Sequence, residues 1–283
     1  MFRFVYIENG KMTIIKGIDE EDCRKTFEAA VAVKETLEVH FLVKCVADSW
    51  SALKKWDRET PRDTYYLMRN LHTSERLVRS FLFEFRTCLD HLETAFKRKS
   101  SEDSQLWDTF ERETNQAYDN CPEYAFTYHL RNFSQHCENV VHRFGSSDNG
   151  LGISSSKNAL LSGFDGWKET DRIFLSKKGE SIELIPVFSK AFDALQEAME
   201  EVMEYLLNHN EIGKNLWYLR KWGDSLSSQL GHDVHSFHIV EMVCGDGSSA
   251  KEEDFARDDI SVNAIAVDWD LIYELTDMMS SGK

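Results

Sequence analysis

The chain has 283 residues, of which 42% are apolar and 29% are charged, and its formal net charge is −16. This composition is that of a globular protein with a sizeable core, and the acidic balance excludes broad nonspecific binding to nucleic acid, which depends on neutralising phosphates. No apolar run approaches the roughly 18 residues that a membrane-spanning helix needs, and the six cysteines form no Cys-x-x-Cys pair, so we expect a cytoplasmic protein with reduced thiols, no membrane contact and no metal or cofactor.

The N-terminal residues predict a hairpin followed by a long helix. Apolar and polar side chains alternate before an Asn9-Gly10 turn, which is typical of a β-hairpin and places one over residues 2–16. Acidic residues 19–22 can then cap a helix whose apolar positions keep helical spacing to about Trp56. Residues 1–18 are therefore assigned to a small N-terminal hairpin.

Two further helices are predicted next. Thr60 and Pro61 have the N-cap and N1 order of a helix start. The cationic run 97–99 suits the end of that helix, and the polar step His72-Thr73-Ser74 can interrupt it. Ser101 with Asp103 can cap a third helix that runs to about residue 120.

The strongest helical pattern is the stretch Cys121–Phe144, CPEYAFTYHLRNFSQHCENVVHRF. Pro122 suits the first turn of a helix, and Gly145-Ser146-Ser147 is typical of a stop. The apolar residues recur at steps of three and four and predict one buried face. They are Phe126, Leu130, Phe133, Cys137, Val141 and Phe144.

A polar patch lies on the other side of this helix. It consists of Arg131, Asn132, Gln135 and His136. Arg131 is four residues from Gln135, and Asn132 is four from His136, so each pair is adjacent on a helical surface. The sequence Arg131-Asn132, three further residues and His136 resembles the signature of the HEPN superfamily, an Arg followed after a short spacer by a His. The wider string YHLRNFSQH resembles the motif helix of bacterial proteins in that group.

This resemblance covers about one helix and implies a fold, a substrate and an assembly. The fold is an antiparallel helical bundle, here over residues 19–145, which the short connections between the predicted helices also favour. The substrate is RNA, and the assembly is a homodimer whose two motifs meet at the interface. Proteins of this kind often act as toxins or in defence against phage, and the sequence does not identify an antitoxin or other protein partner.

The resemblance also assigns roles to the patch. Metal-independent RNA cleavage needs a base for the ribose 2′-hydroxyl, an acid for the leaving oxygen and positive charge on the phosphorane. We expect His136 to be the acid or base, Arg131 to be the phosphate clamp and Asn132 to be the orienting group. The alternative is a non-catalytic helical protein that uses the patch for partner contact or nucleotide binding, which the acidic net charge favours.

Two other stretches carry residue types that a site would need. Arg86 and His91 repeat the spacing of Arg131 and His136, but Thr87 stands where the second copy has an amide. The stretch 231–238, GHDVHSFH, offers three histidines. Their spacing fits neither one strand face nor a standard ligand set, so we expect a loop entering a strand there.

The second half of the chain has no recognised template. Residues 145–158, GSSDNGLGISSSKN, are predicted to be a loop or linker. Further elements are predicted in chain order: a hairpin of 172–176 with 182–187, a helix at 188–208, a shorter helix to about 230, strands at 236–244 and 262–267, and a helix at 269–279. The fold class is therefore mainly α, with the bundle, the hairpin and an α+β region at 146–283 that is either a separate domain or an extension of the bundle.

Overall fold

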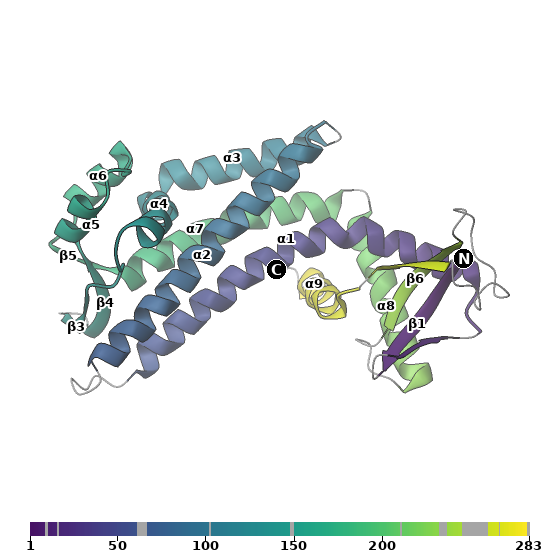
Figure 1. Ribbon diagram of the computed structural model, residues 1–283. Helices are drawn as coiled ribbons and strands as arrows, with labels where there is room; N and C mark the ends of the chain where they lie inside the picture. Colours follow the sequence, from purple (N-terminus) through teal and green to yellow (C-terminus); the bar gives the residue numbers. More distant parts are fainter. Residues whose placement is uncertain are drawn as a thin grey trace. The chain divides into compact units, whose positions relative to one another are not determined.

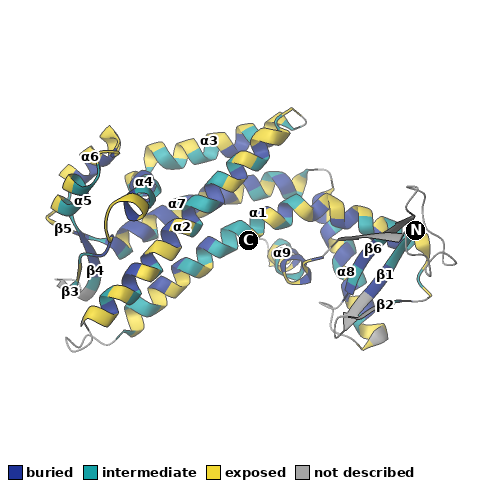
Figure 2. Ribbon diagram, in the orientation of Figure 1, coloured by how far each residue is buried: buried dark blue, intermediate teal, exposed yellow. Residues whose placement is uncertain are grey.

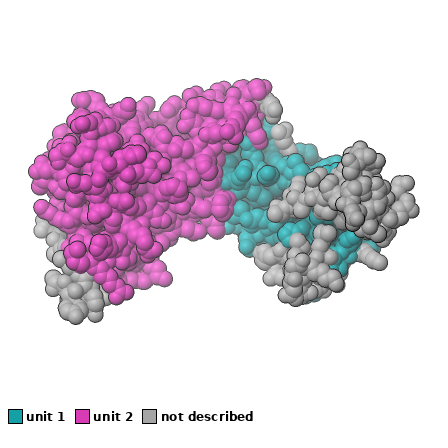
Figure 3. Space-filling model, viewed as in Figure 1, with its two compact units in different colours: residues 1–40, 206–283 teal, residues 41–205 magenta. Residues whose placement is uncertain are grey.

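A computed structural model describes residues 1–8, 11–15, 17–60, 67–101, 103–147, 150–209, 211–231, 237–244, 260–265 and 267–281. They form a mainly helical protein with small antiparallel sheets (Figure 1). The chain divides into two compact units, residues 1–40 with 206–283 and residues 41–205 (Figure 3). These boundaries fall inside two long helices, at different positions from the predicted boundaries after residues 18 and 145.

The unit of residues 1–40 and 206–283 contains a four-stranded antiparallel sheet with the order β2-β1-β6-β7. The strands are β1 (Phe2–Glu8), β2 (Lys11–Ile14), β6 (Phe237–Cys244) and β7 (Ile260–Ile265). The predicted N-terminal hairpin is confirmed, although its Asn9-Gly10 turn lies outside the described residues. It pairs with strands from the far end of the sequence, so it belongs to the same sheet as they do.

Helices α8 (Ile212–Leu230) and α9 (Trp269–Ser281) pack in this unit. Phe4 of β1 is fully buried, and its ring lies 5.3 Å from that of Trp222 on α8. The indole of buried Trp269 donates a hydrogen bond to the carbonyl of Phe237 at 3.1 Å. Arg220 of α8 forms an ion pair with Asp277 of α9, so aromatic burial and one charge pair hold the two helices in place.

The unit of residues 41–205 is a helical bundle with a small sheet. Its helices are α2 (Leu67–Lys99), α3 (Ser104–Asn120), α4 (Pro122–His136), α5 (Lys157–Gly163), α6 (Glu169–Ser176) and parts of α1 (Glu20–Glu59) and α7 (Leu184–Asn208). Trp50 of α1, Phe81 of α2 and Phe188 of α7 are buried, with successive ring centroids 5.5 and 5.1 Å apart. These inward faces are the buried stripes in Figure 2.

Local signals fixed several of these helices. Asp103 is the N-cap of α3, where its Oδ1 accepts the backbone N–H of Leu106 at 3.0 Å. The phenol of Tyr205 also donates to Asp103, and burial together with that bond raises the pKa of Tyr205 to about 12. Helix α2 passes through His72-Thr73-Ser74 without interruption, because the Ser74 hydroxyl donates to the carbonyl of Leu71 within the helix.

The prediction of a single helix over Cys121–Phe144 is wrong, because α4 ends at His136. Cys137 is exposed at the C-cap, Val141 is buried in the turn that follows, and Phe144 lies on a strand against Trp56 with ring centroids 5.6 Å apart. Steps of three and four had placed all three on one helical face. Short apolar runs do not separate helix from strand by periodicity alone.

The prediction of a loop at 145–158 is also wrong. Strands β3 (Arg143–Ser147) and β4 (Gly150–Ser156) pair there, and β5 (Ser181–Glu183) adds to the other edge of β4. The expected hairpin of 172–176 with 182–187 is replaced by α6, β5 and the start of α7. The backbone pairing is supplemented by a side-chain bond, in which the Ser181 hydroxyl of β5 donates to that of Ser154 on β4 at 2.8 Å.

Candidate active site

Helix α4 is embedded in its unit along most of its length. Phe126 and Phe133 are fully buried and stack on Trp167, with centroids 5.4 and 6.0 Å apart and ring planes within about 21°. The Trp167 indole is itself fixed by a hydrogen bond to the carbonyl of Leu160 at 2.8 Å. This packing fixes the position of α4 in its unit. Polar residues of the predicted patch reach the surface at the last turn of the helix.

Arg131, Asn132 and His136 lie in the last two turns of α4. The first two are half-buried, whereas His136 is exposed as the final helical residue. Nη1 of Arg131 is 3.5 Å from Oδ1 of Asn132, which is a weak contact. His136 is five positions after Arg131, a rise of about 7.5 Å along the axis. Arg131 therefore contacts Asn132, and His136 lies further along the helix.

The charge of Arg131 has no carboxylate partner within the described parts of the chain. Its Nε is buried and lacks a hydrogen-bond acceptor among the same residues. Asn132 Oδ1 is the one side-chain hydrogen-bond acceptor of the guanidinium among the described residues. A half-buried, uncompensated arginine is costly unless an anion completes it.

A carboxylate from α2 holds the turn that follows α4. Oε2 of Glu75 accepts the backbone N–H groups of Val140 at 2.9 Å and Val141 at 2.7 Å, and Oε1 pairs with Nε of Arg79 at 2.6 Å. Arg79 in turn donates to the side chain of Asn139 at 3.3 Å. Glu75 thus replaces the helical acceptors that these backbone groups would otherwise need, which is the physical reason that α4 ends where it does.

His142 lies on the other side of this turn and is already engaged. Its Nδ1 accepts the backbone N–H of Ser156 at 3.3 Å and is 3.1 Å from the hydroxyl of Ser155. That hydroxyl donates to the carbonyl of Val140 at 2.7 Å. Nδ1 also lies 3.1 Å from the carbonyl of Val140, and Nε2 is buried without a partner among the described residues. His142 is therefore part of the support for the turn, and His136 is the exposed imidazole.

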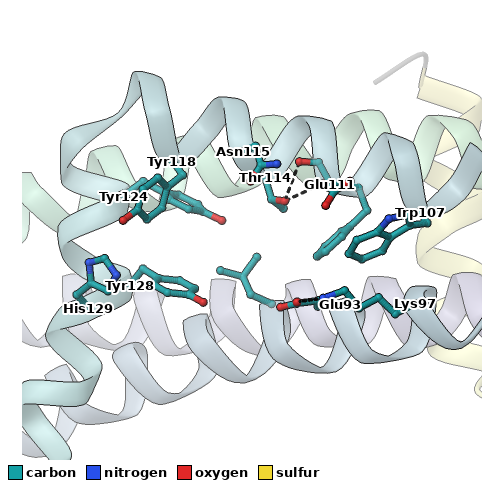
Figure 4. A pocket seen from close by; sticks show the side chains of 12 residues that line it. Glu93, Lys97, Trp107, Glu111, Thr114, Asn115, Tyr118, Tyr124, Tyr128 and His129 are labelled. Atoms are coloured by element: carbon teal, nitrogen blue, oxygen red, sulfur yellow. Dashed lines mark hydrogen bonds and ion pairs between the residues drawn. The ribbon is translucent and has the colours of Figure 1, made fainter. Parts of the chain in front are cut away.

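A pocket of about 380 Å³ opens between α2, α3 and α4. Figure 4 shows Tyr118, Tyr124, Tyr128 and His129 at one end and Trp107 at the other. Carboxylates of Glu93 and Glu111 and the amide of Asn115 also line it. Burial raises the pKa values of the Tyr118 and Tyr124 phenols, so both remain protonated near neutral pH and can act as hydrogen-bond donors.

His129 at the end of this pocket lies against a buried acid. Its Nδ1 lies 2.8 Å from Oδ2 of Asp171, and the two side chains are 9% and 0% exposed. Asp171 also accepts the backbone N–H of Lys168 at 2.9 Å, at the start of α6. Nδ1 has no hydrogen bond of acceptable geometry among the described residues despite this short distance, so the contact is a close approach of the two side chains.

The sequence did not single out His129, Asp171 or Glu75. His129 is seven residues before His136 and so lies on nearly the same side of α4, which was a usable signal. Asp171 and Glu75 are remote in sequence, and no local pattern connects them to α4. Of the stretch 231–238, residues 232–236 lie outside the described residues and His238 is on β6.

Over the described ranges, no group of three or more His, Cys, Asp or Glu side chains is placed to hold a metal ion. None of the helices in those ranges combines the length and apolar character needed to cross a membrane. Comparison of the chain with protein families, curated proteins and solved structures gave no match.

Proposed function

We propose that the chain is a metal-independent endoribonuclease of HEPN type that uses Arg131, Asn132 and His136. One observation carries the proposal. A half-buried arginine whose charge no described carboxylate neutralises lies beside an amide, about one and a half turns before an exposed histidine. A phosphate oxygen would supply the missing acceptor, and the guanidinium fork matches two such oxygens.

The chemistry follows from these groups. Arg131 binds the scissile phosphate and stabilises the negative charge that develops on the phosphorane. Asn132 orients the guanidinium through its carbonyl oxygen and keeps its amide N–H groups for phosphate. The 2′-oxygen attacks phosphorus, its proton passes to a base, and the P–O5′ bond breaks as an acid protonates O5′. The products are a 2′,3′-cyclic phosphate and a 5′-hydroxyl.

The one exposed histidine in the last turn of α4 does not supply both the acid and the base. His142 cannot be the second, because its Nδ1 is occupied and its Nε2 is buried. We therefore propose a homodimer in which the ends of two α4 helices face each other and each contributes His136. Light scattering at micromolar concentration should give twice the chain mass. A protein that cleaves RNA as a strict monomer would overturn the composite site.

Cleavage of a labelled single-stranded RNA in the presence of EDTA tests the enzyme. We expect cleavage with cyclic phosphate ends, and a loss of about a hundredfold to ten-thousandfold in rate for His136→Ala. The thermal melting temperature of this variant should not change, because the side chain is exposed. Cleavage that EDTA abolishes, or full activity in His136→Ala, would remove the proposal.

The cellular role that accompanies this proposal is that of a toxin or a phage-defence effector. Its support is the HEPN resemblance of the helix around Arg131 and His136. Induced expression should then stop bacterial growth, and His136→Ala should restore it at equal protein level. Growth arrest by both forms would separate the toxicity from the site.

A second candidate is a non-catalytic nucleotide-binding protein. The pocket between α2, α3 and α4 favours it, because aromatic rings line its walls and His129, 2.8 Å from Asp171, lies at one end. Quenching of tryptophan fluorescence by a nucleoside, lost in Trp107→Leu, together with no RNA cleavage, would favour this candidate.

A further inference from the structure

Helix α2 is a basic element in an acidic chain. It carries seven Arg or Lys and four Asp or Glu residues, a net charge of +3, whereas the whole chain has 33 basic and 49 acidic residues. Its cations include four arginines in its first twenty residues, at 69, 76, 79 and 86. A local excess of this sign within a chain of charge −16 indicates a surface with a specific anionic partner.

These arginines lie on one side of the helix. Arg69, Arg76, Arg79, Phe83 and Arg86 are separated by steps of seven, three, four and three residues, which keeps them within one face. We call them the α2 arginine stripe. All but the half-buried Arg86 are exposed, and Phe83 is 49% exposed. The stripe spans 17 steps of the helix, or about 26 Å.

The stripe keeps free positive charge after its internal pairs are counted. Glu75 is committed to Arg79 and to two backbone N–H groups, and Asp90 is committed to Arg86. Arg69 and Arg76 have neither a hydrogen bond nor an ion pair with any residue that the structure describes. Two guanidinium groups are thus exposed and uncommitted at the N-terminal end of the stripe.

The stripe also runs past the end of α4. Arg79 contacts Asn139, three residues after His136, and Glu75 holds the backbone of Val140 and Val141. A strand of phosphates that follows the stripe would therefore pass beside the candidate active site. An exposed aromatic ring between Arg79 and Arg86 is the arrangement in which bases stack while cations track the backbone.

We infer that the α2 arginine stripe binds single-stranded RNA, with the guanidinium groups of Arg69 and Arg76 on the phosphates and Phe83 against a base. Arg86 stays paired with Asp90 and marks the C-terminal end of the stripe. The inference rests on the proposed ribonuclease, for which it supplies the substrate path. A second copy of the chain is a poor occupant of the stripe, because arginines would face arginines. An acidic peptide matches the charge but offers no base to stack on Phe83.

Binding is measured in a His136→Ala background, so that the RNA stays intact. Fluorescence anisotropy of a labelled single-stranded oligoribonucleotide is followed over a range of KCl concentrations. Each phosphate contact contributes about 0.7 to the slope of log K against log salt for single strands. Arg69→Gln with Arg76→Gln should therefore lower the slope by about 1.4 and weaken binding about tenfold or more per arginine at low salt.

The matched control is Arg24→Gln with Arg112→Gln, two exposed arginines on α1 and α3. This pair changes the net charge of the chain by the same amount and should leave the slope unchanged. Phe83→Ala should weaken binding by about fivefold to 150-fold, the effect of one lost stacked base, without changing the slope.

Equal slopes for the two double variants would overturn the stripe as the binding surface. Competition by a polyglutamate peptide as strong as that by unlabelled RNA would replace RNA with an acidic protein as its partner. The protein could bind RNA in a salt-dependent way that needs Arg69 and Arg76, and yet not cleave it. That result would contradict the proposed ribonuclease but support RNA binding by the stripe.

Discussion

Helices α2 and α4 each carry an arginine followed five residues later by a histidine, and the two copies differ in what surrounds the arginine. Arg86 of α2 forms two contacts of 2.8 and 2.9 Å with the carboxylate of Asp90 and lies 3.6 Å from the ring centroid of Tyr128. Within the part of the chain that the structure describes, the one side-chain hydrogen bond of Arg131 on α4 is the weak one to Asn132. The spacing is the same, but only one of the two charges is neutralised.

The residue four positions after each arginine explains the difference. That position is Asp90 after Arg86 and Gln135 after Arg131, and residues four apart are neighbours on a helix. One guanidinium nitrogen in each copy, Nη1 of Arg86 and Nε of Arg131, is buried without an acceptor among the described residues. The carboxylate of Asp90 therefore makes Arg86 a structural residue, whereas Arg131, which has Gln135 at that position, remains available to an anion.

The largest expected effect is on RNA cleavage. Arg131→Ala should lower the single-turnover rate by about a hundredfold to a thousandfold, because it removes the charge that stabilises the phosphorane. Arg131→Lys should recover part of the rate, since it restores the charge without the planar fork. Arg86→Ala and His91→Ala are the controls from the other copy and should reduce the rate much less. Equal losses from both copies would show that the proposed assignment of the site to α4 is wrong.

The next effect concerns the support of α4 by α2. Glu75→Ala leaves the buried N–H groups of Val140 and Val141 without an acceptor, so the free energy of unfolding in urea should fall by about 2–4 kcal/mol. Glu93→Ala breaks a more exposed pair with Lys97 on the same helix and should cost less than about 1 kcal/mol.

Glu75 is a positioning residue, because it holds the backbone of the turn that follows α4. Hydrogen exchange at Val140 and Val141 should therefore accelerate in Glu75→Gln under conditions where the protein is folded. Unchanged exchange in that variant, with unchanged stability in Glu75→Ala, would contradict the proposed anchor of the helix end.

The sequence was informative where the determinants are local. Helices α1 and α3 begin at acidic residues that cap or precede them, and the motif residues of α4 share one short helix, so periodicity and spacing located them. The end of α4 was missed because its determinant, Glu75, is about 65 residues earlier. The β3–β4 hairpin was missed because its Gly- and Ser-rich composition is typical of a loop, whereas its serine hydroxyls bond to a neighbouring strand and to the preceding turn. The pairing of His129 with Asp171 was missed for the same reason of distance in sequence.

The smallest expected effect is on the free energy of unfolding. Here Arg86→Ala should have the larger effect and Arg131→Ala the smaller one, the reverse of their order for RNA cleavage. Arg86→Ala removes a cation–π contact worth about 0.5–2 kcal/mol and a helical ion pair worth about 0.3–0.5 kcal/mol, so the free energy of unfolding should fall by about 1–2 kcal/mol. Arg131→Ala removes a buried Nε donor that has no acceptor among the described residues, and its effect should stay within about 0.5 kcal/mol. A double-mutant cycle of Arg86→Ala with Tyr128→Leu, measured by urea unfolding, isolates the ring contact. A loss of stability in Arg131→Ala as large as that in Arg86→Ala would show that both arginines are structural, and the comparison between the two helices would then carry no argument for a site on α4.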